Sequence, residues 1–166
     1  MHSPTALVVA AVLALSSPSA APAPPPTAAS ADRWDWPVAP PHPIVRQFIA
    51  PATQYSAGHR GIDIAAPDGV VVAPAGGVVH FAGIVVDRPV LSIEHPGGIL
   101  TSYEPVTTQL SAGQVVARGE VVGAVIEGHC SSPCLHFGVR VNGLYVSPLT
   151  YLGGIEHAVL LPTRPG

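Results

Sequence analysis

The feature that most constrains the fold is a series of short β-branched runs, interrupted by glycine and proline, with no stretch suited to a long helix. Such runs stand at residues 76–86, 89–104 and 119–128, and each has the length of one or two β-strands. Within the second run, EHPGGIL predicts a hairpin turn between strands at 92–94 and 100–103. The pattern predicts an antiparallel all-β domain of about 120 residues, large enough to bury an ordinary core without help from a metal or a disulfide.

The N-terminal part of the 166-residue chain does not fit this pattern. The apolar run ALVVAAVLAL at 6–15 is too short to span a bilayer as a helix, and small residues follow it, which is typical of a secretory signal peptide. The preceding MHSPT has no lysine or arginine, so an uncleaved anchor and a mis-set start codon stay open. We expect a signal peptide at 1–21, a Pro/Ala-rich extended linker at 22–33, a folded domain at 34–157 and a C-terminal tail at 158–166.

The charge balance argues against nucleic acid as a partner. The chain has seven arginines, no lysine and ten acidic residues, and its formal net charge is −3. A strongly basic face is therefore not expected. We predict an extracytoplasmic protein, secreted or in the cell envelope, that contacts a membrane only if its N-terminal segment stays uncleaved.

The first segment that suggests chemistry is GHRGIDIAAPDG at 58–69. His59 and Asp63 stand four residues apart at the start of a predicted strand, and His136 on a distant strand could supply a third ligand to the same cation. Two histidines and one aspartate with an open fourth position form a catalytic zinc arrangement. The His-x-x-x-Asp pair alone is weak evidence, because an exposed histidine and a turn-capping aspartate give the same pattern.

The two cysteines of the chain, Cys130 and Cys134, bracket the turn before His136. The segment that ends in Leu-His-Phe reads as a strand, and alternation along it points Cys134 and His136 to the same face. A free Cys134 thiolate on zinc would close the site with four ligands. Export would place the pair in an oxidising compartment, so we expect a Cys130–Cys134 disulfide that staples the turn.

Four segments in order resemble the LytM/lysostaphin-type zinc endopeptidases of bacterial cell walls, a family with the duplicated hybrid motif. They are the His-x-Gly-x-Asp start with its Ala-Pro-x-Gly turn, LSIEHPGGILTSYEPV, AGQVVARGEVVG and the Leu-His-Phe strand, and they span about residues 56–152. The resemblance implies a twisted antiparallel sheet with one zinc ion in a groove where a peptidoglycan peptide lies. It also implies that the metal ligands are His59, Asp63 and His136.

Two histidines that the family uses without binding metal are absent. Cys134 stands at the first position of the family's His-x-His segment, and Pro105 stands where a Tyr-x-His segment has its histidine. The resemblance implies that these histidines activate water and stabilise the oxyanion, and losing one such group costs on the order of 10² to 10³ in rate. His129 and Glu104 are candidate substitutes. We interpret His129 as a solvated loop residue, and alternation from Tyr103 predicts that Glu104 faces away from the site.

Two functions remain open. The first is a zinc metalloendopeptidase of peptidoglycan cross-link peptides whose activity is weak or altered. The second is a degenerate domain that keeps the zinc and binds cell wall or regulates another cell-wall hydrolase. The retained ligands favour the first, and the missing histidines favour the second. A lipoyl- or biotinyl-type module, suggested by AGQVVARGEVVGAV, is excluded because the chain has no lysine to carry the modification.

Overall fold

The computed structural model of the chain describes residues 33–53 and 55–153. The expected signal peptide at 1–21 and the expected tail at 158–166 lie outside these residues. Every strand pair in the described part is antiparallel, and its helix, α1, covers Leu149–Leu152. The predicted all-β fold is therefore confirmed. Within 33–53 and 55–153, the helical structure is too short to cross a membrane.

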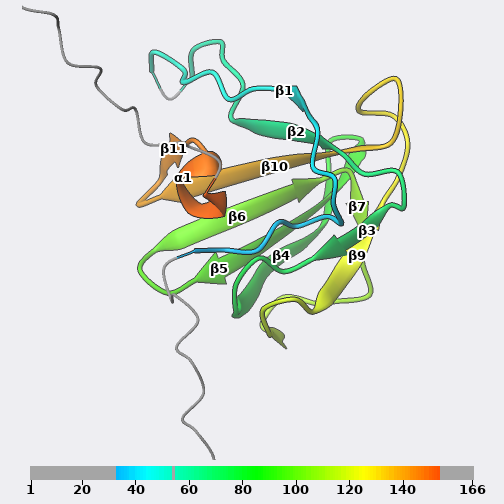
Figure 1. The fold of residues 1–166 in the computed structure, drawn as a ribbon. Coiled ribbons are helices and arrows are strands. Elements are labelled where there is room, and N and C mark those ends of the chain that lie inside the picture. The colour runs from blue at the N-terminus through cyan, green and yellow to red at the C-terminus, as the bar shows by residue number, and fades with distance from the viewer. Residues whose placement is uncertain (1–32, 54, 154–166) are drawn as a thin grey trace, which may run out of the picture.

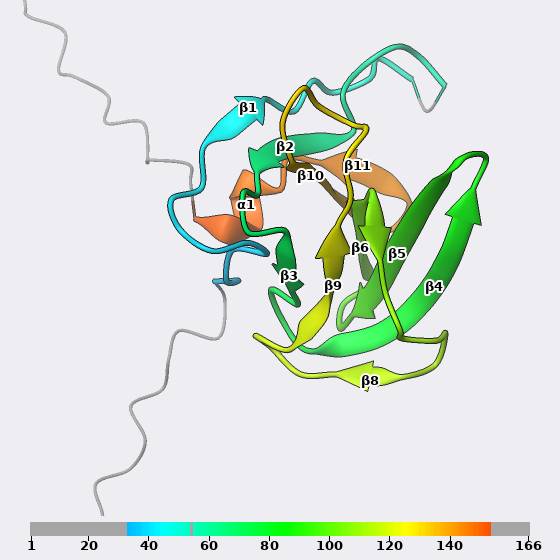
Figure 2. The same ribbon diagram turned by 90° about the vertical axis from the view of Figure 1, so that its right-hand side faces the viewer.

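Two sheets form the domain (Figures 1 and 2). The larger sheet has the strand order β1-β2-β10-β6-β5-β4-β8, and β11 pairs with β10. Its strands are β1 (Ile44–Arg46), β2 (Gly61–Ala65), β10 (Cys134–Val141), β6 (Ile99–Glu104), β5 (Arg88–His95), β4 (Gly77–Val85), β8 (Val115–Val116) and β11 (Leu144–Val146). The smaller sheet has the order β3-β9-β7, with β3 (Val70–Val72), β9 (Val121–Val125) and β7 (Val106–Thr107).

The core lies between the two sheets, because its buried hydrophobic side chains come from strands of both. Ile62 and Ile64 of β2 and Leu135 and Phe137 of β10 are fully buried in it. Successive side chains of a strand point to opposite faces. The residues between these core positions therefore face away from the core, and on β2 and β10 those residues are Asp63 and His136.

The predicted hairpin is present between β5 and β6. Ser92 pairs with Ser102 and His95 pairs with Ile99, so three residues form the turn. Gly97 and Gly98 have φ angles of 84° and 71°, which glycine adopts without the steric cost that a side chain would add. The Pro-Gly-Gly sequence thus fixes the register between β5 and β6, and β6 in turn pairs with β10.

His95 at the end of β5 belongs to a buried polar network and not to a metal site. Its Nδ1 lies 2.9 Å from the Gly76 carbonyl oxygen, and its Nε2 lies 2.9 Å from the Thr101 hydroxyl. The same hydroxyl contacts the Tyr103 hydroxyl at 3.0 Å. Burial lowers the pKa of His95 despite the opposing effect of the hydrogen bond to Gly76, so the site favours the neutral form of this imidazole.

Candidate metal centre

The pairing of β2 with β10 brings two of the predicted ligands together. His136 lies directly opposite Asp63 in the antiparallel register, on the face away from the core. Side chains that are directly opposite in such a pair stand about 5 Å apart at Cβ. His59 precedes β2 and is held by a bridge to Ile49, through two backbone hydrogen bonds of 3.0 and 2.9 Å. The fold thus supplies all three side chains to one point from positions 77 residues apart in the chain.

Gly61 explains why glycine stands between His59 and Asp63. A Cβ at this position would lie 2.8 Å from Nε2 of His136 and would collide with the Phe137 carbonyl oxygen. Any side chain here would push β10 away from β2 and displace His136. The His-x-Gly-x-Asp pattern is therefore a packing requirement of the site as well as a ligand spacing.

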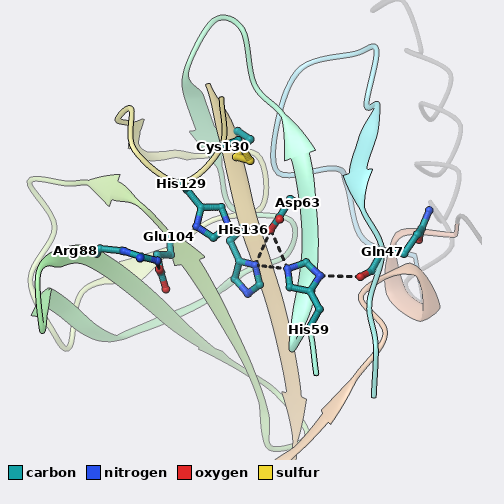
Figure 3. Close-up of polar contacts among 9 residues, drawn as sticks. Gln47, His59, Asp63, Arg88, Glu104, His129, Cys130 and His136 are labelled. Atoms are coloured by element: carbon teal, nitrogen blue, oxygen red, sulfur yellow. Dashed lines mark hydrogen bonds and ion pairs between the residues drawn. A yellow bond between two sulfur atoms is a disulfide. The ribbon is translucent and has the colours of Figure 1, made fainter. Parts of the chain in front are cut away.

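Three ligand atoms lie close enough to one another to bind a single small cation (Figure 3). His59 Nε2 lies 3.1 Å from Asp63 Oδ1 and 3.1 Å from His136 Nδ1, and His136 Nδ1 lies 2.7 Å from Asp63 Oδ1. Ligand atoms of a tetrahedral zinc with bonds of about 2.1 Å stand roughly 3.4 Å apart, so a modest expansion would admit the ion. The Nδ1–H of His59 donates to the Gln47 carbonyl oxygen at 2.7 Å, which leaves the Nε2 lone pair facing the cluster.

The electrostatics of Asp63 match this donor set. Burial opposes its ionisation, but hydrogen bonds from His136 and His129 and the charges of His136 and His59 outweigh burial and lower the pKa of Asp63 to about 2. The carboxylate is therefore ionised at neutral pH. Asp63 and His59 are buried at 3% and 5% exposure, whereas His136 is partly exposed, so the cluster is open on the side of His136.

His129 points into the cluster, and its interpretation as a solvated loop residue is wrong. Its Nε2 lies 3.1 Å from Asp63 Oδ1, and its ring is in edge contact with the ring of His136 at a centroid distance of 5.4 Å. Its side chain is 16% exposed, the same fraction as that of His136. Figure 3 shows His129 and His59 on different sides of the His136 ring.

Glu104 shares the face of His136, and the prediction that it faces away from the site is wrong. Tyr103 packs in the core against Phe137, at 5.3 Å between ring centroids, so alternation turns its neighbour Glu104 to the opposite face. Glu104 and His136 are directly opposite on β6 and β10. The Glu104 carboxylate, however, accepts a hydrogen bond of 2.9 Å from Arg88 Nη1 (Figure 3).

The two positions of the missing histidines carry no substitute side chain of their own. Cys134 is 2% exposed and forms a disulfide with Cys130, with 5.9 Å between the Cα atoms. Both sulfur atoms are therefore bonded and offer no thiolate to a metal, although they stand near His129. Pro105 is buried, and its carbonyl oxygen accepts the backbone N–H of Ile126 at 3.1 Å.

A basic and aromatic group that the sequence interpretation missed lies on the same sheet. The guanidinium carbons of Arg60 and Arg140 lie 5.5 and 5.6 Å from the ring centre of Tyr145, within cation–π range. Arg140 is four residues beyond His136 on β10, so alternation turns both to one face. Strand alternation, counted along the chain from His136, is the sequence signal that could have identified Arg140.

Fold and site together define an all-β protein with a two-histidine, one-aspartate centre that can hold a single metal ion. Residues 57–148 match the model of Peptidase family M23. The chain therefore belongs to this family, and the resemblance read from the sequence is confirmed.

The comparisons also identify relatives. An uncharacterized protein of Mycobacterium tuberculosis is 44% identical over 135 residues, which are 76% of this chain and 54% of the relative. The murein hydrolase activator NlpD of Salmonella dublin is 32% identical over 152 residues, 89% of this chain and 38% of the relative. The crystal structure of a zinc-containing peptidase from Vibrio cholerae superimposes with a TM-score of 0.54 and 29% identity, over 69% of this chain and 38% of that one. The chain thus spans about half or less of the length of these proteins.

Proposed function

We propose that this chain is an exported zinc metalloendopeptidase domain that acts on the cross-link peptides of peptidoglycan, with His59, Asp63 and His136 as its zinc ligands. The observation that carries the proposal is the convergence of three ligand atoms within 3.1 Å of one another, two from the paired strands β2 and β10 and one from His59 just before β2. Zinc, when bound, would act as a Lewis acid on a peptide carbonyl and would acidify a bound water. Similarity to a zinc-containing peptidase supports this choice of metal.

Other groups of the chain would orient the ligands, set the charge of the centre and bind the substrate. The Gln47 carbonyl fixes the orientation and tautomer of His59. Asp63 supplies one negative charge, so two neutral imidazoles and one carboxylate would leave a zinc ion with a net positive charge. Arg140 offers a cation on the same face, four residues from His136, where it suits a carboxylate of the substrate peptide. These features favour an anionic peptide lying across β10.

A second candidate function rests on a specific observation. The residues that stand at the positions of the two missing histidines, Pro105 and the disulfide-bonded Cys134, have side chains that cannot act as an acid or a base. The similarity to a murein hydrolase activator supports a domain that binds cell wall and regulates another hydrolase. In this case the zinc and the open side of the cluster would serve binding alone.

Metal analysis and cell-wall digestion of the purified protein test both functions. We expect one equivalent of zinc in the wild type and none after His59→Ala. Release of cross-link peptides from isolated peptidoglycan, measured by mass spectrometry and lost in His59→Ala, would support the enzyme. Zinc with sacculus binding but no release would support the regulator. Absence of measurable zinc affinity would exclude both.

A further inference from the structure

We infer that His129 replaces the imidazole lost at position 134, and that the Cys130–Cys134 disulfide places it in the site. This inference deepens the proposed function and rests on it, because it assigns a hydrogen-bonding role beside the metal to a loop residue. His129 acts as the group that holds a substrate or water oxygen on the open side of the centre. It does not act as a fourth ligand.

The loop that carries His129 is anchored at both ends. Before it, the backbone N–H of Ile126 donates to the Pro105 carbonyl, and after it the Ala66 N–H donates to the Pro133 carbonyl at 3.0 Å. Gly128 has a φ of 119°, a conformation that a side chain would strain, and it turns the chain immediately before His129. The loop therefore enters the site by a turn that its sequence permits.

The disulfide completes this placement. Cys134 pairs with Ala65 on β2, two residues from the pair of His136 with Asp63, and its side chain is buried beside the cluster. Bonding Cys130 to that fixed sulfur brings the neighbouring residue, His129, over Asp63. At the position where the family has a histidine, this chain thus has the disulfide-bonded Cys134. The segment held by that bond places the imidazole of His129, five residues earlier in the chain, in the site.

The contacts of His129 distinguish a neighbour of the metal from a ligand. A fourth tetrahedral ligand would stand at roughly the same separation, about 3.4 Å, from each of the other three. Among the described residues, His129 has a hydrogen-bond contact with Asp63, whereas its contact with His136 is a ring contact and not a nitrogen–nitrogen one. The three predicted ligands instead contact one another pairwise.

The chemistry of the available side chains indicates the role of His129. An imidazole offers a donor or an acceptor nitrogen to an oxygen within hydrogen-bond reach, which proline and a disulfide sulfur do not. Glu104 shares the face, but Arg88 occupies its carboxylate. The partly exposed His129 is therefore the side chain best placed to contact an oxygen bound on the open side of the cluster.

The experiment uses the zinc-loaded full chain with inorganic phosphate as the probe, since phosphate is a tetrahedral oxyanion that needs no catalysis. Three variants are compared with the wild type: His129→Ala, His59→Ala and Ser131→Ala, the last a control at an exposed residue of the same loop. Zinc affinity is measured by competition with a chromophoric chelator, and phosphate affinity by calorimetry. A double variant, Cys130→Ser with Cys134→Ser, tests the anchor.

We expect His129→Ala to weaken phosphate binding by about 10- to 100-fold, the effect of losing a hydrogen bond to a charged group. Its zinc affinity should fall by about 10- to 100-fold at most, as for a residue that contacts a ligand without binding the metal, and by less than in His59→Ala; Ser131→Ala should match the wild type in both affinities. The double cysteine variant should lose phosphate affinity as His129→Ala does. Peptidoglycan cleavage, where the wild type shows it, should fall by about 10² or more in His129→Ala.

Each contrary outcome is distinct. A loss of zinc affinity in His129→Ala equal to that in His59→Ala would make His129 a fourth ligand and overturn the inference. Unchanged phosphate affinity in His129→Ala, or no phosphate binding by the wild type, would also overturn it. A wild type that binds zinc and phosphate through His129 but cleaves no peptidoglycan would instead refute the proposed enzyme and leave the placement of His129 supported.

Discussion

Removing the disulfide should lower the stability of the domain modestly and the order of the site strongly. Cys130 and Cys134 are four residues apart, so the bond closes a loop of five residues. In the chain-entropy model a loop this short contributes about 2 kcal/mol at 25 °C. For a folded part of about 120 residues, this corresponds to a decrease in Tm of roughly 5 to 12 °C. Because the loop lies outside the core cluster, the β-sheet itself should remain folded.

The assay is thermal unfolding followed by circular dichroism, for the wild type with and without a reductant and for Cys130→Ser with Cys134→Ser. Reduced wild type and the double variant should unfold at similar temperatures, both below the oxidised protein, with unchanged far-ultraviolet spectra. Alkylation of native protein should detect no thiol before reduction and two after it. Two alkylatable thiols in native protein, or equal Tm values in all three samples, would refute the reasoning.

Three further predictions follow from the structure. Zinc at 100 times its Kd should stabilise the wild type by about 2.7 kcal/mol, seen as a rise in Tm that a chelator reverses and that Asp63→Ala abolishes. The pKa of His95 is lowered by burial, so the unfolded chain takes up its proton first as pH falls below about 6.5; denaturant unfolding should show the wild type losing more stability between pH 7 and pH 5 than His95→Gln. Arg140→Ala should reduce binding to isolated sacculi by about five- to tenfold through loss of a carboxylate contact, and sacculi with amidated carboxylates should not distinguish the variant from the wild type.

The fold was predictable from the sequence because local signals agreed with one another. The Pro-Gly-Gly turn, the alternation on either side of it and the β-branched runs all indicated the same hairpin, which is the β5–β6 pair. The cluster of His59, Asp63 and His136 followed from spacing and family resemblance, and the fold brings the three side chains together.

The errors at Glu104 and His129 have physical causes. Alternation shows that Tyr103 and Glu104 face opposite sides of a strand, but it does not show which side is the core. The prediction for Glu104 requires that Tyr103 lie on the face of the site, whereas the Tyr103 ring is fully buried against Phe137. His129 is 66 residues from Asp63 in the chain, so its contact with Asp63 depends on the Cys130–Cys134 disulfide and on the register of β10. Neither can be deduced from the residues next to His129 alone. The usable signal was a histidine adjacent to a cysteine whose partner lies on the site strand.

The two candidate substitutes differ in a way that mutation can resolve. Glu104 lies one strand away from His136 on the same face, yet its carboxylate is paired with Arg88, whose side chain is 46% exposed. Such a partly exposed pair contributes little to stability, but it still occupies the carboxylate and directs it away from Asp63. His129 contacts Asp63 directly. We therefore expect Glu104→Gln to reduce peptidoglycan cleavage by less than about fivefold, against about 10² for His129→Ala. Rates measured on the same peptidoglycan preparation, with both variants at equal zinc content, decide between them, and the reverse order would identify Glu104 as the substitute.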